Sequence, residues 1–203
     1  EQLGLWARAI RASFLVQQGD VQAASTEASE VLTSARAPPL AEAHAIHTLG
    51  NVAHVRGDFD VADARYAQAF EMRLRLHDVR GAAYSAVARG ALHTQFARPQ
   101  VAGDLIKEGY RLARRADDAF CMMMVHIYAG DIAAFEGRFD DASANYEQSL
   151  RLEEFAGHHQ FRAMLKRRLG GICRQQGDHV RALALHEEGA ELALAVGDER
   201  SRA

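Results

Sequence analysis

Polar turn pairs divide the chain into stretches in which small and apolar side chains return at the same positions. The pairs are Gly19-Asp20, Gly57-Asp58, Ala97-Arg98, Gly137-Arg138 and Gly177-Asp178, and the intervals between them are 38, 40, 40 and 40 residues. An alanine lies five residues after the start of every pair, at Ala24, Ala62, Ala102, Ala142 and Ala182. A small residue lies seven residues before every pair, at Ala12, Gly50, Gly90, Gly130 and Gly170. A fixed period of this length indicates stacked structural repeats.

Each interval between turn pairs is long enough for two helices. Ala, Leu, Glu and Arg are abundant, β-branched residues are sparse and three prolines occur, a composition typical of helical proteins. The turn pairs place helices near residues 3–18 and 21–36, 40–56 and 60–76, 79–95 and 99–115, 119–136 and 140–156, and 159–176 and 180–196. The small residues are expected where the helices of a pair cross, because helices approach closely only where the intervening side chain is nearly absent. We expect no sheet.

A column of large side chains follows the repeated alanines by four residues. It consists of Tyr66, Ile106, Tyr146 and His186, and Ala28 holds this place in the first repeat. The Gly-Asp pairs can end one helix and cap the next, and Phe59 and Phe139 can pack against the preceding helix. Pro99 begins the corresponding helix of the third repeat, where its fixed φ suits the first turn. Between repeats, His77-Asp78, Asp117-Asp118 and Gly157-His158 can stop one helix and cap the next.

These columns resemble those of the tetratricopeptide repeat (TPR) family, over essentially the whole chain. The resemblance is plainest in Leu49-Gly50, Gly57, Phe59, Ala62, Tyr66 and Ala69, and in Gly130, Gly137, Phe139, Ala142 and Tyr146. The family's usual repeat has about 34 residues. The 40-residue spacing is similar to the extended repeats in sensor arms of large bacterial transcription regulators and in kinesin light chains. The resemblance implies an all-α, right-handed superhelical solenoid of five TPR-like helix-turn-helix repeats, with ten helices.

The repeats are expected within one solenoid domain that covers residues 1–203. Their approximate ranges are 1–39, 40–78, 79–118, 119–158 and 159–198. Gly197-Asp198 stands at a repeat joint, so residues 197–203 are interpreted as the start of a truncated sixth repeat. We therefore expect a segment of a longer array.

The resemblance also implies that the first helix of each pair lines a concave groove that holds a ligand or peptide. The repeat register then predicts the groove residues His44, His47, Asn51, His54, Tyr84, Val87, Met124, Ile127, Asp131, Met164, Arg167 and Arg174. This groove runs from a histidine-rich side, through an apolar middle, to an arginine-bearing end.

The histidines have an alternative interpretation as metal ligands. His44 and His47 lie three residues apart on one helical stripe and could hold two positions of one ion. His54 lies ten residues after His44, about 15 Å along the helix axis, which is too far for the same ion. A polar groove wall is the favoured interpretation, and we expect no metal and no cofactor.

The middle and the far end of the groove each leave two interpretations open. Met122, Met123 and Met124 could form a soft apolar floor for a peptide or could belong to the helix core. Arg167 and Arg174 could hold a carboxylate of a ligand, or Asp131 could neutralise them within the protein.

Charge and motifs exclude several classes of function. The net charge is −3, with 24 basic and 27 acidic residues, so we expect no direct binding of nucleic acid. The sequence has no apolar run long enough to cross a membrane and no secretory signal, which indicates a cytoplasmic protein. Cys121 and Cys173 are far apart and are expected to be reduced. The phosphate-binding, nucleophile-elbow and zinc-protease motifs are missing, so we expect no enzyme.

The favoured interpretation is a non-catalytic scaffold or sensor module of a larger cytoplasmic regulatory protein, binding a protein or peptide partner through the concave groove. The alternatives are a domain that senses a small-molecule effector and an oligomerisation element, for example a homodimer formed through the solenoid surface.

The alanine column provides a direct test of the register. Replacing Ala62 or Ala142 with Leu should overpack a helix crossing and lower the free energy of unfolding by about 1–3 kcal/mol. Thermal melts followed by circular dichroism measure the change. Unchanged melting midpoints in both variants would refute the register.

Overall fold

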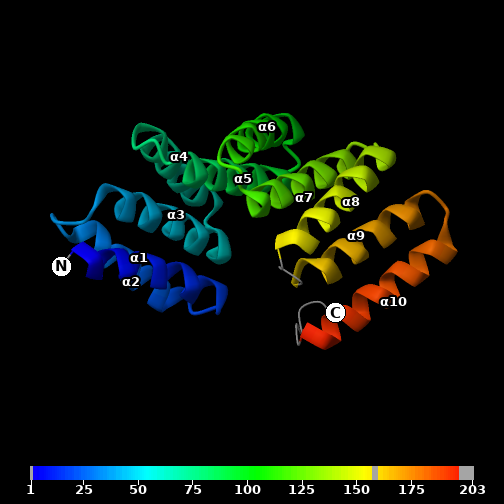
Figure 1. Cartoon of the computed structure of the whole chain (residues 1–203), viewed down its shortest axis with the longest axis horizontal. Helices are drawn as coiled ribbons and strands as arrows, with labels where there is room; N and C mark the ends of the chain where they lie inside the picture. The colour runs from blue at the N-terminus through cyan, green and yellow to red at the C-terminus, as the bar shows by residue number, and fades with distance from the viewer. Residues whose placement is uncertain (1, 157–159, 197–203) are drawn as a thin grey trace.

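The computed structural model describes residues 2–156 and 160–196. Ten helices and no strand are found within these ranges. They are α1 (Gln2–Gln17), α2 (Val21–Thr33), α3 (Pro39–Arg56), α4 (Phe59–Arg75), α5 (Val79–Gln95), α6 (Pro99–Arg115), α7 (Ala119–Phe135), α8 (Phe139–Ala156), α9 (Gln160–Gln175) and α10 (His179–Val196). The predicted all-α solenoid of five helix pairs is confirmed (Figure 1).

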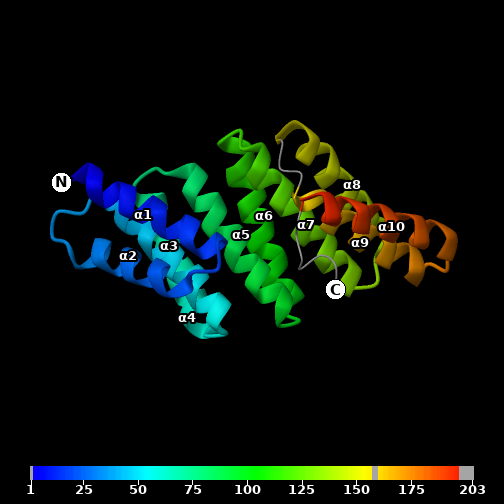
Figure 2. The ribbon, with the colours of Figure 1, turned by 90° about the horizontal axis from the view of Figure 1, so that it is seen from below.

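The helices of each pair pack against each other, and each pair packs against the next. In addition, α1 packs against α3, α5 packs against α7, and α3 contacts α5, so the first helices of the first four pairs lie side by side. The pairs follow one another from the N-terminal end to α9 and α10 at the opposite end (Figures 1 and 2). None of the described helices is both long and apolar enough to cross a membrane.

Left-handed residues end the helices, as the turn pairs predicted. Gly19, Gly57, Gly137 and Gly177 have φ values of 75° to 85°. Ala97 takes this conformation in the third repeat, and His77 and Asp117 take it between pairs, with φ values of 49° to 57°. The side chains of Asp20, Asp78, Asp118 and Asp178 each accept a hydrogen bond from the backbone N–H three residues later.

Two details of the helix ends differ from the sequence prediction, and two predicted features lie outside the described residues. The side chain of Asp58 makes no cap hydrogen bond at the start of α4. Helix α2 ends at Thr33, three residues early, because Ser34 is already extended on the approach to Pro38. Both the Gly157-His158 joint and the supposed sixth repeat at 197–203 include residues outside the described ranges.

The small residues that precede each turn pair contact the large residues that follow the repeated alanines. A Cβ atom added to Gly50 would lie 2.7 Å from the Tyr66 ring, and one added to Gly130 would lie 2.5 Å from the Tyr146 ring. The same relation joins Gly90 to Ile106 at 2.7 Å, and Gly170 to His186 at 2.9 Å. Each glycine of a first helix therefore makes room for the large side chain of the second helix in its own pair.

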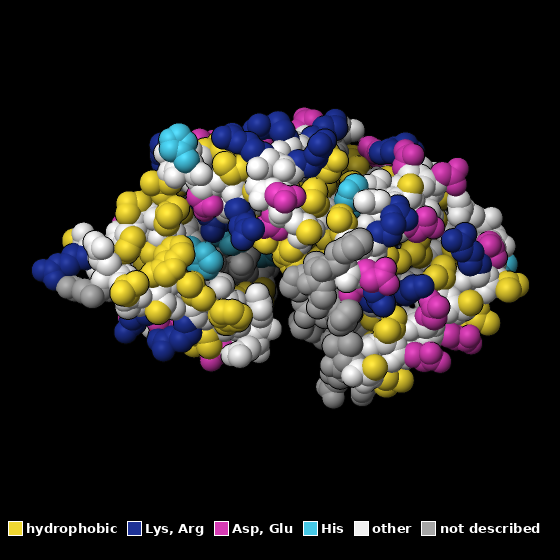
Figure 3. Space-filling view, in the orientation of Figure 1, with side chains coloured by type: hydrophobic (Ala, Val, Ile, Leu, Met, Phe, Trp, Pro, Cys, Tyr) yellow, Lys and Arg dark blue, Asp and Glu magenta, His cyan; other side chains and the backbone are white. Residues whose placement is uncertain are grey.

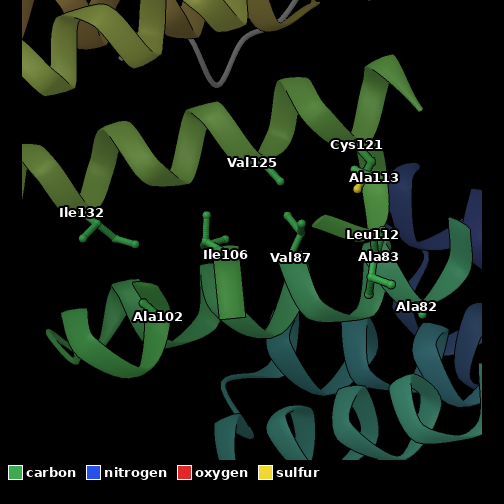
Figure 4. Packing of buried hydrophobic residues seen from close by; sticks show 10 residues of the cluster. All are labelled: Ala82, Ala83, Val87, Ala102, Ile106, Leu112, Ala113, Cys121, Val125 and Ile132. Carbon is green, nitrogen blue, oxygen red and sulfur yellow. The ribbon is translucent and has the colours of Figure 1, made fainter. Parts of the chain in front are cut away.

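The central core continues from these crossings. Val87 of α5 and Ile106 of α6 point toward α7, which contributes Val125 and Ile132 (Figure 4). The five repeated alanines are all buried, and none is more than 4% exposed. The solenoid is thus held by close helix crossings within the pairs and by clusters of buried apolar side chains between the pairs.

Two glycine-to-alanine substitutions test the crossing. Gly130→Ala forces a methyl group against the Tyr146 ring, and we expect it to lower the free energy of unfolding by about 1–3 kcal/mol. Gly171→Ala is the matched control, because its Cβ meets nothing within 4 Å and it lies within α9. This control should stabilise the protein by about 0.4–1 kcal/mol. Urea titrations measure both changes, and equal effects of the two substitutions would contradict the crossing contact.

Candidate functional site

An open pocket lies where α3, α5 and α7 meet, and we call it the central pocket. Its volume is about 230 Å³. It is lined by His47, Asn51, His54, Tyr66, Tyr84, Val87, Ala88, Ala91, Phe120, Met124 and Tyr128. None of these described lining residues is an acid, a lysine or an arginine. Figure 3 shows the face on which the molecule is hollowed between its two ends.

The central pocket contains half of the predicted groove residues. They are His47, Asn51, His54, Tyr84, Val87 and Met124. Sequence reasoning missed Tyr66, Phe120 and Tyr128 as lining residues. The signal for two of them was present, because Phe120, Met124 and Tyr128 are spaced by four residues and share one face of α7.

The other predicted groove residues lie elsewhere. Ile127 was placed on the groove, but it is 1% exposed and belongs to the core beneath α8 and α9. Met164 packs against the same core. The His44 ring packs against the Trp6 ring in a tilted arrangement, with ring centroids 5.9 Å apart. Arg167 and Arg174 are exposed on α9 and do not line the central pocket.

Met122, Met123 and Met124 were expected either on the floor of the groove or in the helix core, and the structure shows both locations. Met123 is fully buried in the helix core, and Met122 packs against the core cluster. Met124 reaches the central pocket while also contacting the core. Only Met124 is therefore positioned to contact a molecule in the pocket.

A buried hydrogen-bond network links Arg73 and Ser85 to His47. Arg73 of α4 is 5% exposed, and its Nη1 donates to the backbone oxygen of Gly81 and to Ser85 Oγ, each at 2.8 Å. Ser85 Oγ lies 3.2 Å from His47 Nδ1. Asp78 Oδ2 lies 3.7 Å from Arg73 Nε and balances part of its charge. Burial lowers the pKa of Arg73 to about 10, so the guanidinium stays charged at neutral pH.

Both neighbouring histidines are neutral at pH 7. Burial, with help from the positive charge of Arg73, lowers the pKa of His44 to about 4, against an opposing effect of Asp78. The same two causes hold the pKa of His47 well below its usual range. A guanidinium behind both imidazoles also disfavours a metal cation at His44 and His47. Among the described residues, no group of three or more metal-ligating side chains is found.

Tyrosine hydroxyls tie the first and second helices together at equivalent places in two repeats. Tyr66 donates to Asn51 Oδ1 at 2.9 Å, and Tyr146 donates to Asp131 Oδ1 at 2.7 Å. In the fourth repeat Arg168 completes the group, with its Nη2 3.1 Å from Asp131 Oδ2. The internal partner of Asp131 is thus Arg168. Neutralisation of Arg167 and Arg174 by Asp131 was one of the two interpretations of this end of the groove, and Arg168 takes that place.

The helix pairs and their crossings define a TPR-type solenoid. Residues 7–196 match the family of the MalT-like TPR region, and the chain belongs to this family. A comparison with curated protein sequences gives no match.

Three solved structures share the fold. BtubC from P. vanneervenii has 15% identity and a TM-score of 0.75, with 98% of this chain and 84% of that chain covered. A Rap protein, solved in complex with competence and sporulation factor, has 12% identity and a TM-score of 0.84, with 99% of this chain and 57% of that chain covered. MamA from Desulfovibrio magneticus RS-1 has 12% identity and a TM-score of 0.62, with 94% and 96% covered. At these identities the likeness concerns the fold alone.

The two neutral histidines predict how stability depends on pH. Their folded pKa values lie below the unfolded value of 6.5, so their contribution is complete above pH 6.5 and is lost as the pH falls toward the folded values. For His44, whose folded pKa is about 4, we expect a loss of about 1–3 kcal/mol between pH 7 and pH 4.5. Urea titrations at pH 7, 6, 5 and 4.5 measure it.

The His44→Gln, His47→Gln double variant should flatten this dependence. His179→Gln is the control, because His179 is exposed on α10. The explanation fails if the double variant loses stability toward pH 4.5 as steeply as the unmodified chain.

Proposed function

We propose that this chain is a non-catalytic module that binds a protein or peptide in the central pocket. It serves as the sensor or scaffold arm of a larger cytoplasmic regulatory protein. The observation that carries the proposal is the make-up of the pocket, which combines an apolar floor, aromatic walls and a few polar groups without an acid, a lysine or an arginine. Aromatic and apolar surfaces with few polar groups are typical of binding sites.

The walls and the floor have separate roles in this proposal. Tyr84 and Phe120 stand with ring centroids 6.0 Å apart and provide large, rigid contact surfaces. Val87, Ala88 and Met124 form an apolar floor, and Asn51 adds an amide that can bond to a backbone. All of these side chains project from helices, so the site is preformed and little order has to be created on binding.

The similar proteins support this proposal at the level of the fold. The Rap protein was solved in complex with competence and sporulation factor, and its fold resembles this chain over 99% of the length of this chain. This chain spans 57% of that Rap chain, so the Rap chain extends beyond the region of likeness.

A displayed library of random 12-residue peptides, selected on the purified chain, provides the probe. The enriched peptide is then synthesised and measured by calorimetry. Phe120→Ala should weaken binding at least tenfold, because it removes an aromatic wall. Ala88→Asp should abolish measurable binding, because it places an unpaired charge in an uncharged pocket.

Ala144→Asp on the exposed face of α8 is the matched control and should bind like the unmodified chain. Melting curves of all variants confirm that the fold persists. The proposal is contradicted if the selected peptide binds both pocket variants undiminished, or if the library yields no binding peptide.

A further inference from the structure

Two buried polar residues occupy positions that are apolar in two or more other repeats, although the fourth repeat has the buried Glu153 at the position of Arg73. The register position of Arg73 is held by Ala113 in the third repeat and by Ala193 in the fifth, and both alanines are fully buried. The register position of Ser85 is held by Ala45, Val125 and Leu165, which are at most 3% exposed. Helix packing at these positions therefore requires neither an arginine nor a serine.

The side chains of Arg73 and Ser85 contact each other, and their hydrogen-bond network reaches the central pocket through His47. Arg73 Nη1 lies 2.8 Å from Ser85 Oγ, and Ser85 Oγ lies 3.2 Å from His47 Nδ1. Gly81 makes room for the arginine, since a Cβ at Gly81 would lie 2.8 Å from Arg73 Cδ. His47 is the last residue of this hydrogen-bond network and also a lining residue of the pocket.

The positions of the hydrogen atoms in this network follow from which groups can donate and which can accept. A guanidinium can only donate, so Ser85 Oγ accepts from Arg73. The Ser85 hydroxyl is fully buried and needs an acceptor for its own hydrogen, and His47 Nδ1 is within reach. His47 therefore accepts at Nδ1 and carries its hydrogen on Nε2, the opposite edge of the ring. His47 is a lining residue of the pocket, and this N–H lies on the edge of its ring that faces away from Ser85 and Arg73.

We propose that the central pocket receives an uncharged aromatic side chain of a peptide, and that His47, held as the Nε2–H tautomer by Ser85 and Arg73, donates a hydrogen bond to a carbonyl oxygen of that peptide. This inference rests on the proposed function and names the chemistry of its ligand. The volume of about 230 Å³ suits a single ring that packs against the adjoining rings of Tyr84 and Phe120. A donor backed by a cation favours a carbonyl acceptor and opposes a lysine or arginine of the ligand.

The tautomer is measured first, without any ligand. In long-range ¹H–¹⁵N correlation spectra of the chain with ¹⁵N-labelled histidine, His47 should show the Nε2–H pattern at pH 7. Ser85→Ala should remove this preference and increase the Nδ1–H form, while Ser85→Thr, which keeps the hydroxyl, should retain the Nε2–H pattern. Because Ala45 holds the same register position in the second repeat, Ser85→Ala is expected to fold.

Binding is measured next, with the peptide selected from the 12-residue library. Replacing its aromatic residue with Lys should abolish binding. Ser85→Ala should weaken the affinity about three- to tenfold, and Ser85→Thr should restore it. His47→Leu removes the donor and should weaken binding at least as much as Ser85→Ala.

The results separate this inference from the proposed function. If the selected peptide binds in the pocket but His47 is the Nδ1–H tautomer, or Ser85→Ala leaves the affinity unchanged, the role of His47 is refuted and the proposed function stands. If the peptide tolerates Lys in place of its aromatic residue, the ligand chemistry is refuted. If no peptide binds the pocket, both proposals fall, whatever tautomer the spectra show.

Discussion

The close crossing of the two helices in each pair is the contact on which the rest of the structure depends. A glycine on the first helix lets the second helix approach until a large side chain, such as Tyr66 or Tyr146, lies against its backbone. This contact fixes the rotation of both helices, and with it the sides that meet the next pair and the sides that face the groove. The tyrosine hydroxyl then reaches a polar side chain of the first helix, Asn51 or Asp131, and holds it in place. Packing and the arrangement of polar groups are therefore set by the same contact.

Sequence reasoning predicted the helices well, because the features that begin, end and cross them are local. Left-handed glycines, capping aspartates and the small residues at crossings lie within one repeat and recur at a fixed interval. The groove was predicted in part. On α7 the stripe facing the pocket passes through Phe120 and Tyr128 and leaves Ile127 in the core, because contacts with α8 and α9 set the rotation of that helix. The burial of Arg73 could not be predicted, since its partners Gly81 and Ser85 belong to the next repeat.

Polar groups are placed unequally along a chain whose backbone is regular. The second and fourth repeats combine a tyrosine at the crossing with a buried charged residue one turn from the end of the second helix, Arg73 or Glu153. The third and fifth repeats have Ala113 and Ala193 at the latter position. Arg73 is bonded toward the following repeat, and Glu153 accepts from Arg162 of α9 at 2.9 Å. These hydrogen bonds and ion pairs are directional, so they favour one alignment of neighbouring repeats. Apolar packing alone would fix that alignment less strictly.

The central pocket takes its walls from three consecutive helix pairs, through α3, α5 and α7. In a solenoid each pair contacts mainly its neighbours, so small rotations between pairs add up to bending of the whole arm. A molecule bound among three pairs would restrict two successive joints at once and would set the curvature of the middle of the solenoid. The occupancy of one small pocket would thereby change the stiffness and the reach of the whole solenoid.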